Sequence, residues 1–597
     1  MIRTPARWVV PEPEPALARS LAHDAGVSPV TAQVLLNRGV RDADAIARFL
    51  APTLSELEEP AHMADADAAA SRLREALARR ERVLVFGDYD ADGITASALL
   101  CRFLRLCGAD CSVYLPSRLD EGYGLTDAAA REIVRRRPEL VVTADCGTRS
   151  SAQVAGLRSA GIDVIVTDHH EPGGALPPAN AVLNPKRPDC PYPFKGLAGV
   201  GVAFKLAWAA ATRFSLSKKA SPEHRKFLLD SMALVALGTV SDVAPLLGEN
   251  RVLVGYGLKV LSSSAHPGLR SLIEVSRLGD GRLRASDVAF RLAPRLNAAG
   301  RTGSPDDALA LLLEENPERA MALARRLDSA NRRRQQLENG VLREVESALE
   351  RDGPPGAAVV LGSEDWHQGV LGVVCSRIME RTGRPAALVA FDGEEGKGSV
   401  RSPEGIDAAA ALEACRAHLV EYGGHASAGG FRVLRSEFEG FKSAFERAVR
   451  AQPGGRTLEP LLRCEAEVAP EELTPELAEE LERLEPFGCG NPRPVFSARG
   501  LELDGDFRPL GLEGRHCAFR VSSGGRSLRA VAFDLGERRR DLEDCLSRGA
   551  DLAFEISRSE WSGPEGFELV VKDVRPAGSG GRRGGMAFVR RGGGAAQ

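Results

Sequence analysis

RVLVFGDYDADG, residues 82–93, is the stretch of sequence that decides the fold of the first half of the chain. Its β-branched run predicts a short strand, which ends where three alternating aspartates and a glycine begin. From Ile94 to Cys107 apolar residues recur at helical spacing, and Gly108 follows as an end signal. The aspartates therefore occupy a strand-to-helix turn, which is where open α/β sheets bind their ligands.

The same alternation continues along the chain. Apolar runs at 140–144 and 163–167 predict two further buried strands, and helix-like stretches at 126–138 and 150–161 lie between the strands. Strands that alternate with helices predict a parallel sheet with right-handed crossovers. The residues that follow each strand are then expected to meet at one edge of the sheet.

Acidic and imidazole side chains follow these strands. They are Asp88, Asp90, Asp92, Asp145, Asp168, His169 and His170, and Asp242 is expected to join them from the end of a helix. Carboxylates gathered in one place raise one another's pKa unless cations neutralise them. Carboxylate oxygens with one or two imidazole nitrogens suit Mn²⁺ or Mg²⁺, and two such ions about 3.5–4 Å apart form the clamp used in phosphodiester hydrolysis. The pattern therefore predicts a two-metal site.

Each motif alone also has an ordinary structural explanation. An aspartate after a strand is often a helix N-cap, and for Asp145 taken alone this explanation is as good as metal binding. The aspartate triplet imitates the start of a calcium loop, but Leu99 occupies the twelfth position, where such a loop needs glutamate. Adjacent histidines are common in cores, but His169 and His170 follow a buried-type strand and an aspartate. Their joint occurrence favours the metal site.

Several motifs in the right order carry a resemblance to a known family. Asp168-His169-His170 is similar to the signature that names the DHH phosphoesterases, and GDYDADG at 87–93 with GTVSDVAP at 238–245 resembles the RecJ branch. Further RecJ-like blocks lie at 294–301, 366–370, 397–402 and 423–431, so the resemblance covers roughly residues 80–535. It implies a bacterial exonuclease that hydrolyses single-stranded DNA from the 5′ end with Mn²⁺ or Mg²⁺.

The resemblance also implies a set of metal ligands. They are Asp88, Asp90, Asp92, Asp145, His169 and Asp242. Asp145 is implied to bridge the two ions, and Asp168 and His170 are implied to act in catalysis, His170 by orienting or protonating rather than by ligating. Many DHH enzymes have histidine where Phe86 stands, and phenylalanine cannot ligate a metal. Asp88, two residues on, would supply the missing oxygen.

Substrate contacts are expected outside the acidic cluster. The residues that the resemblance implies are Arg295, Asn297, Arg301, Ser399, Arg401 and His425. Glycines beside His425 allow close backbone approach, and a guanidinium grips phosphate oxygens through two hydrogen bonds.

The rest of the chain predicts further domains. Helix formers run from about 317 to 351, about 50 Å of helix, which is long enough to connect two domains. A small α/β unit follows, and short strands from about 455 predict an antiparallel barrel of the OB type, which holds single strands through a basic groove and stacked aromatic rings. The available aromatic residues are Phe487, Phe496, Phe519 and Phe533, and core packing is expected for most of them.

The expected fold class is α/β: a parallel-sheet DHH domain is joined by a long helix to a smaller α/β DHH-associated domain, and an OB-like β-barrel follows. The expected divisions are 1–75 (no assigned role), 76–304 (DHH domain), 305–352 (connector helix region), 353–454 (DHH-associated domain), 455–576 (OB-like nucleic-acid-binding domain) and 577–597 (disordered Gly/Arg-rich tail).

Composition predicts an intracellular enzyme. With 597 residues the chain is long enough for three or four domains, and its net charge of −4 does not by itself indicate nucleic-acid binding. Eleven cysteines, an odd count in a large chain, argue against a disulfide framework. The N-terminus lacks the layout of a secretion signal, and no run is long enough for a membrane span, so cytoplasmic residence is expected.

The predicted function is 5′ to 3′ exonuclease activity on single-stranded DNA, releasing 5′ mononucleotides by a two-metal mechanism in DNA recombination and repair. The family implies a single-strand-binding protein and a RecQ-type helicase as partners of a monomeric enzyme. Three alternatives remain: a DHH phosphodiesterase acting on short oligonucleotides or cyclic dinucleotides, a family II pyrophosphatase, and a non-catalytic single-strand clamp. A family II pyrophosphatase would need a histidine at the position of Phe86. A non-catalytic clamp would have lost metal-ligand residues, whereas this chain keeps its acidic positions.

Overall fold

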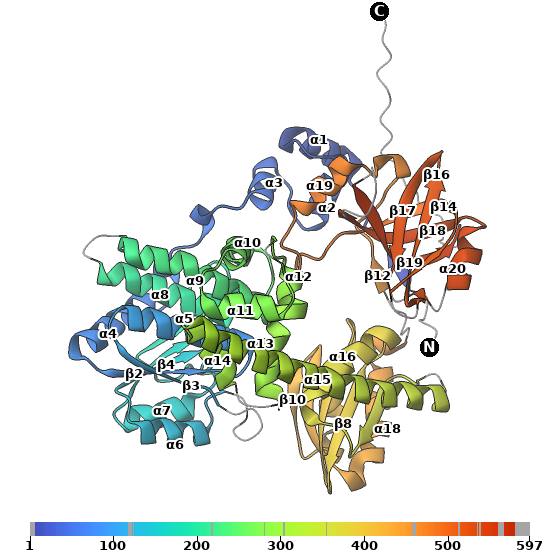
Figure 1. Ribbon diagram of the computed structural model, residues 1–597. Coiled ribbons are helices and arrows are strands. Elements are labelled where there is room, and N and C mark those ends of the chain that lie inside the picture. Colours follow the sequence, from blue (N-terminus) through green and yellow to red (C-terminus); the bar gives the residue numbers. More distant parts are fainter. Residues whose placement is uncertain are drawn as a thin grey trace, which may run out of the picture.

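The computed structural model divides into three parts that follow one another along most of the chain (Figure 1). The first domain is coloured blue to green, the second yellow, and the C-terminal domain red. The structure describes residues 6–116, 122, 124–215, 219–279, 281–302, 305–353, 355–456, 461–511, 514–533, 535–536, 539–558 and 566–578. Of the tail predicted to be disordered, residues 579–597 lie outside these ranges.

The first domain is built on a five-stranded sheet in the order β3-β2-β4-β5-β6, and every neighbouring pair is parallel. The predicted parallel sheet is confirmed, and the three expected strands have the expected bounds. Two short strands at its edges were not expected from the sequence. The strands are β2 (Arg82–Gly87), β3 (Asp110–Tyr114), β4 (Leu140–Ala144), β5 (Asp163–Thr167) and β6 (Ala181–Leu183).

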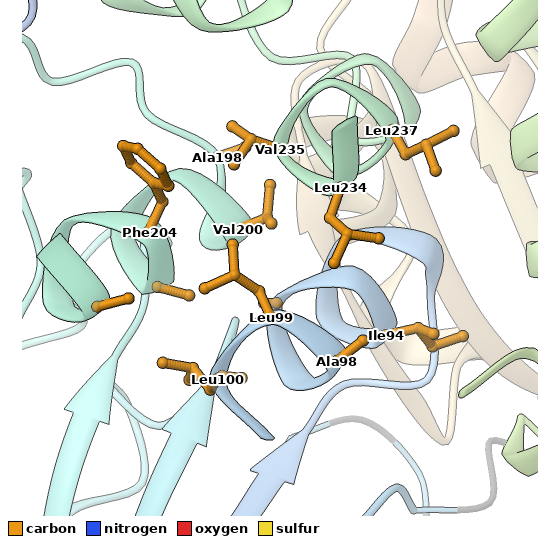
Figure 2. Packing of buried hydrophobic residues seen from close by; sticks show 14 of the residues in the cluster. Ile94, Ala98, Leu99, Leu100, Ala198, Val200, Phe204, Leu234, Val235 and Leu237 are labelled. Atoms are coloured by element: carbon orange, nitrogen blue, oxygen red, sulfur yellow. The ribbon is translucent and has the colours of Figure 1, made fainter. Parts of the chain in front are cut away.

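Helices cover both faces of this sheet, as the alternating pattern requires (Figure 1). Val85 points to the face covered by α4, α5, α8 and α9, whereas Phe86 points to the face covered by α6 and α7. Figure 2 shows Leu99, Val200 and Leu234 of three different helices packed together. The helices are α4 (Ala66–Arg79), α5 (Ala91–Leu106), α6 (Asp127–Arg136), α7 (Ser151–Ser159), α8 (Gly199–Phe214) and α9 (Pro222–Ser241).

A helical segment leads from the first domain to the second. It consists of α10 (Gly248–Ser262), α11 (Pro267–Val275), α12 (Ala285–Asp287), a π-helical turn (Val288–Leu292), α13 (Ala293–Thr302), α14 (Asp306–Leu313) and α15 (Pro317–Asp352). The long helix α15 is the predicted connector. It begins at the N-cap Asn316, packs on α11, α13 and α14, and reaches α16 of the second domain at its far end.

The second domain is a small mixed sheet in the order β10-β11-β9-β8-β7, in which only β7 and β8 run parallel. One side packs against α15 and α16, and the other side packs against α17 and α18. The elements are β7 (Val359–Ser363), α16 (Leu371–Thr382), β8 (Ala386–Asp392), β9 (Glu395–Arg401), α17 (Ala408–Ala414), β10 (Glu421–His425), β11 (Ala428–Leu434) and α18 (Phe438–Ala451).

The strands of the C-terminal domain close into a ring. Pairings run β14-β18-β19-β17-β16, and β16 pairs with β14 again through Leu503 and Val521. The expectation of a purely antiparallel barrel is wrong, because β17 and β19 are parallel. A helix and β18 separate these two strands in the chain, and so long a connection permits parallel pairing. The elements are β14 (Val495–Leu503), β15 (Arg508–Leu510), β16 (His516–Ser523), β17 (Arg526–Ala532), α20 (Arg539–Leu546), β18 (Ala550–Arg558) and β19 (Phe567–Pro576).

The N-terminal region packs into the C-terminal domain. Its helices share one hydrophobic core with the ring and with α19 (Pro475–Glu482), and β1 (Arg7–Val9) pairs with β12 (Leu461–Arg463). The indole nitrogen of Trp8 donates to Asp573 at 2.9 Å, and Thr31 donates to Glu480 at 2.7 Å. We propose that the first domain begins near Met63, where the core on α4 starts. The helices are α1 (Pro15–Ala25), α2 (Pro29–Asn37) and α3 (Ala43–Leu50).

All eleven cysteines are free thiols, as their odd count suggested. Among the residues that the structure describes, no helix has both the length and the apolar composition of a membrane span.

Candidate metal centre and substrate cavity

The predicted acidic and imidazole residues lie together at the carboxyl edge of the first sheet. Asp145 follows β4 and His169 follows β5, and Asp242 caps the end of α9. The Nε2 atom of His169 is 3.1 Å from Asp145 Oδ1, 3.7 Å from Asp242 Oδ2 and 4.0 Å from Asp92 Oδ2. The convergence expected from strand order is therefore present.

These side chains form three overlapping groups whose possible ligand atoms lie within 4.8 Å of one another. The groups are Asp88, Asp90 and Asp145; Asp145, His169 and His170; and Asp92, His169 and Asp242. Asp145 belongs to two of them, as a bridging ligand would. His169 also belongs to two. The groups with Asp88 and with Asp92 offer mainly oxygen ligands, as Mn²⁺ and Mg²⁺ prefer, whereas the group with His170 offers one carboxylate and two imidazoles.

Asp92 is held by the start of α8. Its two carboxylate oxygens accept the backbone N–H groups of Gly199 at 2.7 Å and Val200 at 2.9 Å. Helix N-termini stabilise negative charge, but the side chain is fully buried. Burial, followed by the charge of Asp90, raises the pKa of Asp92 to about 7. A cation bound beside Asp92 would favour the charged form of its carboxylate and lower this pKa.

Glycines allow the helices to approach this carboxylate cluster. A Cβ atom on Gly199 would lie 2.4 Å from Asp145 Oδ1. A Cβ atom on Gly238 in α9 would lie 2.7 Å from Asp92 Oδ1. The sequence analysis did not single out Gly199, because its neighbour in space is 54 positions away in the chain.

Asp145 occupies a strained backbone position. Its φ of 65° lies in the left-handed region, which non-glycine residues rarely adopt outside functional sites. Its backbone N–H donates to Thr167 O at 2.9 Å and so fixes the turn. Burial, followed by the charges of nearby carboxylates, raises the pKa of Asp145 well above its usual value. Asp242 is affected in the same way, and its pKa rises to about 9.

Asp168 supports its neighbours and belongs to none of the three groups. One oxygen accepts the backbone N–H groups of His169 and His170 and lies 2.7 Å from His170 Nδ1. The other oxygen accepts the N–H of Thr148 at 2.9 Å. Burial lowers the pKa of His170, but the hydrogen bond and charge of Asp168 outweigh burial, so the pKa is raised overall. Asp168 therefore orients a protonatable imidazole beside the cluster.

His169 has the protonation state and surroundings of a metal ligand. Burial, followed by the charge of His170, lowers the pKa of His169 to about 3, so the imidazole is neutral. Its Nε2 atom and Asp145 Oδ1 are both buried and have no hydrogen-bond partner in the described part of the chain. Buried polar atoms without partners are rare, and an ion is one of the ordinary explanations. These residues therefore fit a divalent metal.

Phe86 lies on the far face of the sheet from the cluster. Its ring is fully buried and meets Tyr114 edge-on at 5.4 Å. Asp88, two residues on, is brought into one of the three groups. The structure thus places a carboxylate near Asp90 and Asp145, and its role as a metal ligand stays a prediction.

The proposed substrate residues Arg295, Asn297 and Arg301 do not form one group in the structure. Asn297 reaches the metal turn, where its Oδ1 accepts the N–H of Ala91 at 2.8 Å and its Nδ2 donates to Ser241 at 3.2 Å. Arg295 turns toward α15 and pairs with Asp328 at 2.9 Å. The side chain of Arg301 lies outside the described residues.

Ser399, Arg401 and His425 come together on the second domain. Arg401 pairs in register with Ala428, and Ala428 pairs with His425, so these residues form a row across three strands. Arg401 donates to Ser399 Oγ at 3.3 Å on the same face of β9. This cluster presents the donors that a phosphate group needs.

A cavity of about 1710 Å³ lies where the three domains meet. Its wall includes Ser241 and Asn297 beside the metal cluster, Arg377 of the second domain and Phe487 of the C-terminal domain. Ion pairs join the first and C-terminal domains at this cavity, with Arg284 at 3.1 Å from Glu482 and Arg282 at 3.3 Å from Glu485. The metal cluster therefore lies at the edge of a large, open cavity.

Two of the four aromatic residues considered for stacking are core residues. Phe496 and Phe519 are buried, as expected. Phe487 lines the cavity, where the guanidinium of Arg493 lies 4.5 Å from its ring. Phe533 is 51% exposed but does not line the cavity.

Three family models match the chain in order. The model described as DHH family, N-terminal domain, matches residues 82–239, the DHHA1 domain matches 354–451, and the RecJ OB domain matches 464–573. They correspond to the sheet that carries the metal cluster, to the second domain and to the ring of the C-terminal domain.

Full-length relatives match most of the chain. The single-stranded-DNA-specific exonuclease RecJ of Bacillus subtilis is 33% identical over 96% of this chain and 71% of its own length. The RecJ of Thermus thermophilus is 40% identical over 85% and 70%, and that of Escherichia coli is 35% identical over 92% and 96%. A crystal structure of Thermus thermophilus RecJ with Mn²⁺ superposes with a TM-score of 0.80 at 36% identity, covering 95% of this chain and 79% of the other. A second crystal structure of that protein contains Mg²⁺ and gives a TM-score of 0.74 at 35% identity, covering 95% and 78%.

Proposed function

The chain belongs to the RecJ family of single-stranded-DNA-specific exonucleases, and on that premise we propose that the cluster around Asp145 is its hydrolytic centre. The enzyme hydrolyses single-stranded DNA in the 5′ to 3′ direction and uses Mn²⁺ or Mg²⁺. The observation that carries the assignment is the pair of buried, unpartnered atoms Asp145 Oδ1 and His169 Nε2, 3.1 Å apart.

We assign the ligands as Asp88, Asp90, Asp92, Asp145, His169 and Asp242. When two divalent ions are bound there, they stabilise the charge on the attacking and leaving oxygens of phosphodiester hydrolysis. Asp145 and His169 each belong to two groups, and we assign Asp145 as the shared ligand because a carboxylate has two oxygens that can bind different ions, whereas a neutral imidazole has one free lone pair. The N–H groups of Gly199 and Val200 fix the direction of the Asp92 carboxylate.

His170 is assigned to proton transfer. Its Nδ1 atom faces Asp168 at 2.7 Å, which leaves the other ring nitrogen, Nε2, to face the substrate. The raised pKa of His170 keeps a proton on the ring under conditions in which a solvent-exposed histidine would lose it. Asp168 is a positioning residue, because its oxygens are occupied by the backbone and by His170.

Ser399, Arg401 and His425 are assigned to a phosphate of the bound strand. The row across β9, β11 and β10 is supported by its register and by the Arg401 to Ser399 hydrogen bond. Asn297 is assigned a positioning role, because both ends of its amide hold the turn that carries the aspartates. Arg295 is engaged with Asp328 and acts through α15.

The decisive experiment compares products from 5′-labelled and 3′-labelled single-stranded and duplex DNA with Mn²⁺, with Mg²⁺ and with EDTA. We expect metal-dependent release of 5′ mononucleotides from long single strands, sparing of blunt duplex, and no cleavage by Asp145→Ala although that variant still binds DNA. Near wild-type cleavage by Asp145→Ala would contradict the metal assignment. Activity confined to dinucleotides would indicate a small-substrate phosphodiesterase, and binding without cleavage would indicate a clamp.

Family membership is also the support for the remaining proposals. We propose that the enzyme works as a monomer in the cytoplasm, with a single-strand-binding protein and a RecQ-type helicase as partners. Both kinds of partner act on exposed single strands, which are the substrate of this enzyme.

A further inference from the structure

Two apolar side chains stand out on the wall of the cavity. Phe290 is 80% exposed and Val243 is 66% exposed, which makes them the most exposed large apolar side chains among the described residues. Both line the cavity that reaches the metal cluster. Single exposed apolar residues are usually scattered over a surface, so their location in one concave wall points to a ligand with an apolar face.

The backbone holds Phe290 in this exposed position. It lies in the π-helical turn Val288–Leu292, a rare conformation that is frequent at functional sites. Val288 and Leu292 on either side are fully buried, and the turn packs against α9. The side chain is therefore presented to the cavity by a well-anchored turn.

Val243 is held in its exposed position by a left-handed backbone conformation at the end of α9. Its φ of 59° is unusual for a β-branched residue and carries a strain cost. Hydrogen bonds from Val243 N to Val240 O and from Ala244 N to Thr239 O close the end of α9 around it. It follows directly after the metal-cluster residue Asp242, so its exposed side chain lies at the inner end of the cavity.

Phe290 lies farther from the metal centre along the same wall. Asn297 contacts the aspartate turn, and the separation of seven positions between it and Phe290 corresponds to about 10 Å of helix. The nearby guanidinium groups of Arg282 and Arg284 are already paired with glutamates. An apolar contact, rather than a new ion pair, is what this part of the wall offers to a strand.

We propose that Phe290 stacks on a nucleobase of the bound strand, with Val243 as a smaller apolar contact next to the metal centre. The proposal rests on the proposed function, and it identifies how the cavity holds DNA without reading its sequence. Every nucleobase has a π face, so an aromatic platform binds all sequences alike. The distance of Phe290 from the aspartate turn places the stacked base beyond the nucleotide that is being cleaved.

The test couples a protein change with a DNA change. Strands of one sequence carry a single abasic site, which is moved stepwise from the 5′ end, and kcat/KM is measured with Mn²⁺ for the wild type and for Phe290→Ala. We expect Phe290→Ala to lower kcat/KM on the intact strand about tenfold, mainly through KM, within the range of about 5- to 150-fold typical of base stacking. At one position the abasic site should cost the wild type a similar factor and cost the variant almost nothing.

Several outcomes separate the possibilities. The proposal fails if the wild type cleaves the strands but the abasic penalty is the same in wild type and variant at every position. A wild type that does not cleave at all would contradict the proposed function instead. Leu229→Ala is the matched control, because Leu229 is also exposed on α9 but lies thirteen residues before Asp242, and it should keep wild-type kcat/KM on every strand. Phe290→Leu restores an apolar but not an aromatic surface, and it should recover only part of the loss.

Discussion

Gly199→Ala should disable the metal centre without unfolding the protein. The new Cβ atom would lie 2.4 Å from Asp145 Oδ1, whereas ordinary van der Waals contact begins at 3.4 Å, so the carboxylate or α8 must move by about 1 Å. A misplacement of that size in a catalytic constellation costs about 100-fold in rate. Gly199 is the first residue of α8, and alanine there lowers the conformational entropy of the unfolded chain relative to glycine, so the metal-free protein should remain folded.

The assay measures kcat/KM on single-stranded DNA at saturating Mn²⁺, the Mn²⁺ affinity by calorimetry and thermal unfolding of the metal-free protein. We expect kcat/KM to fall about 100-fold, a weaker Mn²⁺ affinity and an unchanged unfolding temperature. Gly201→Ala in the same helix is the matched control, because its Cβ would contact the side chain of Leu197, whose nearest atom is a methyl carbon at 3.3 Å. Wild-type kcat/KM and Mn²⁺ affinity in Gly199→Ala would refute the reasoning, since the cluster would then tolerate a shift of about 1 Å.

Two further predictions concern proton release and domain docking. The pKa values of Asp92 and Asp242 are raised to about 7 and about 9, so below these pH values a cation must displace protons from the two carboxyl groups. Mn²⁺ affinity should therefore rise between pH 6 and 9. Calorimetry in buffers of different ionisation heat should detect the released protons. Equal heats in all buffers would contradict this. Arg251→Met should lower the free energy of unfolding by about 3 kcal/mol and loosen the C-terminal domain, because the buried guanidinium donates to the carbonyls of Phe49, Arg483 and Leu484. Urea unfolding and limited proteolysis identical to wild type would count against that role.

Local patterns were sufficient to predict the parts of the site that sit on strand ends. The run at 82–87 has an apolar, β-branched composition and a clear boundary at the first aspartate, so both its type and its end could be predicted. Parallel order then brings Asp145 and His169 to the same edge without further information. The connector α15 was predictable for a similar reason, because its helix formers run almost unbroken and end at Gly353.

The features that were missed depend on contacts between distant positions. In the sequence, Gly199 cannot be distinguished from other glycines at the start of a helix, because its role depends on its contact with Asp145. Asn297 was predicted to bind substrate, which stays a prediction; its amide also bonds to Ala91 and Ser241, and no pattern around Asn297 indicates those two partners. The parallel pairing of β17 with β19 likewise follows from how the ring closes and not from the alternation within either strand.

The N-terminal region shows why domain order in sequence is a poor guide to the cavity. Its apolar residues complete the core of a domain that begins more than 400 residues later, so neither segment alone would bury its hydrophobic face. The same combined domain carries Phe487 on the cavity wall and receives the guanidinium of Arg251 from α10. Both ends of the chain therefore contribute to one wall of the space that leads to the metal cluster. It follows that the start of the chain and the C-terminal domain line the cavity together, although the residues assigned to the chemistry lie between them in the sequence.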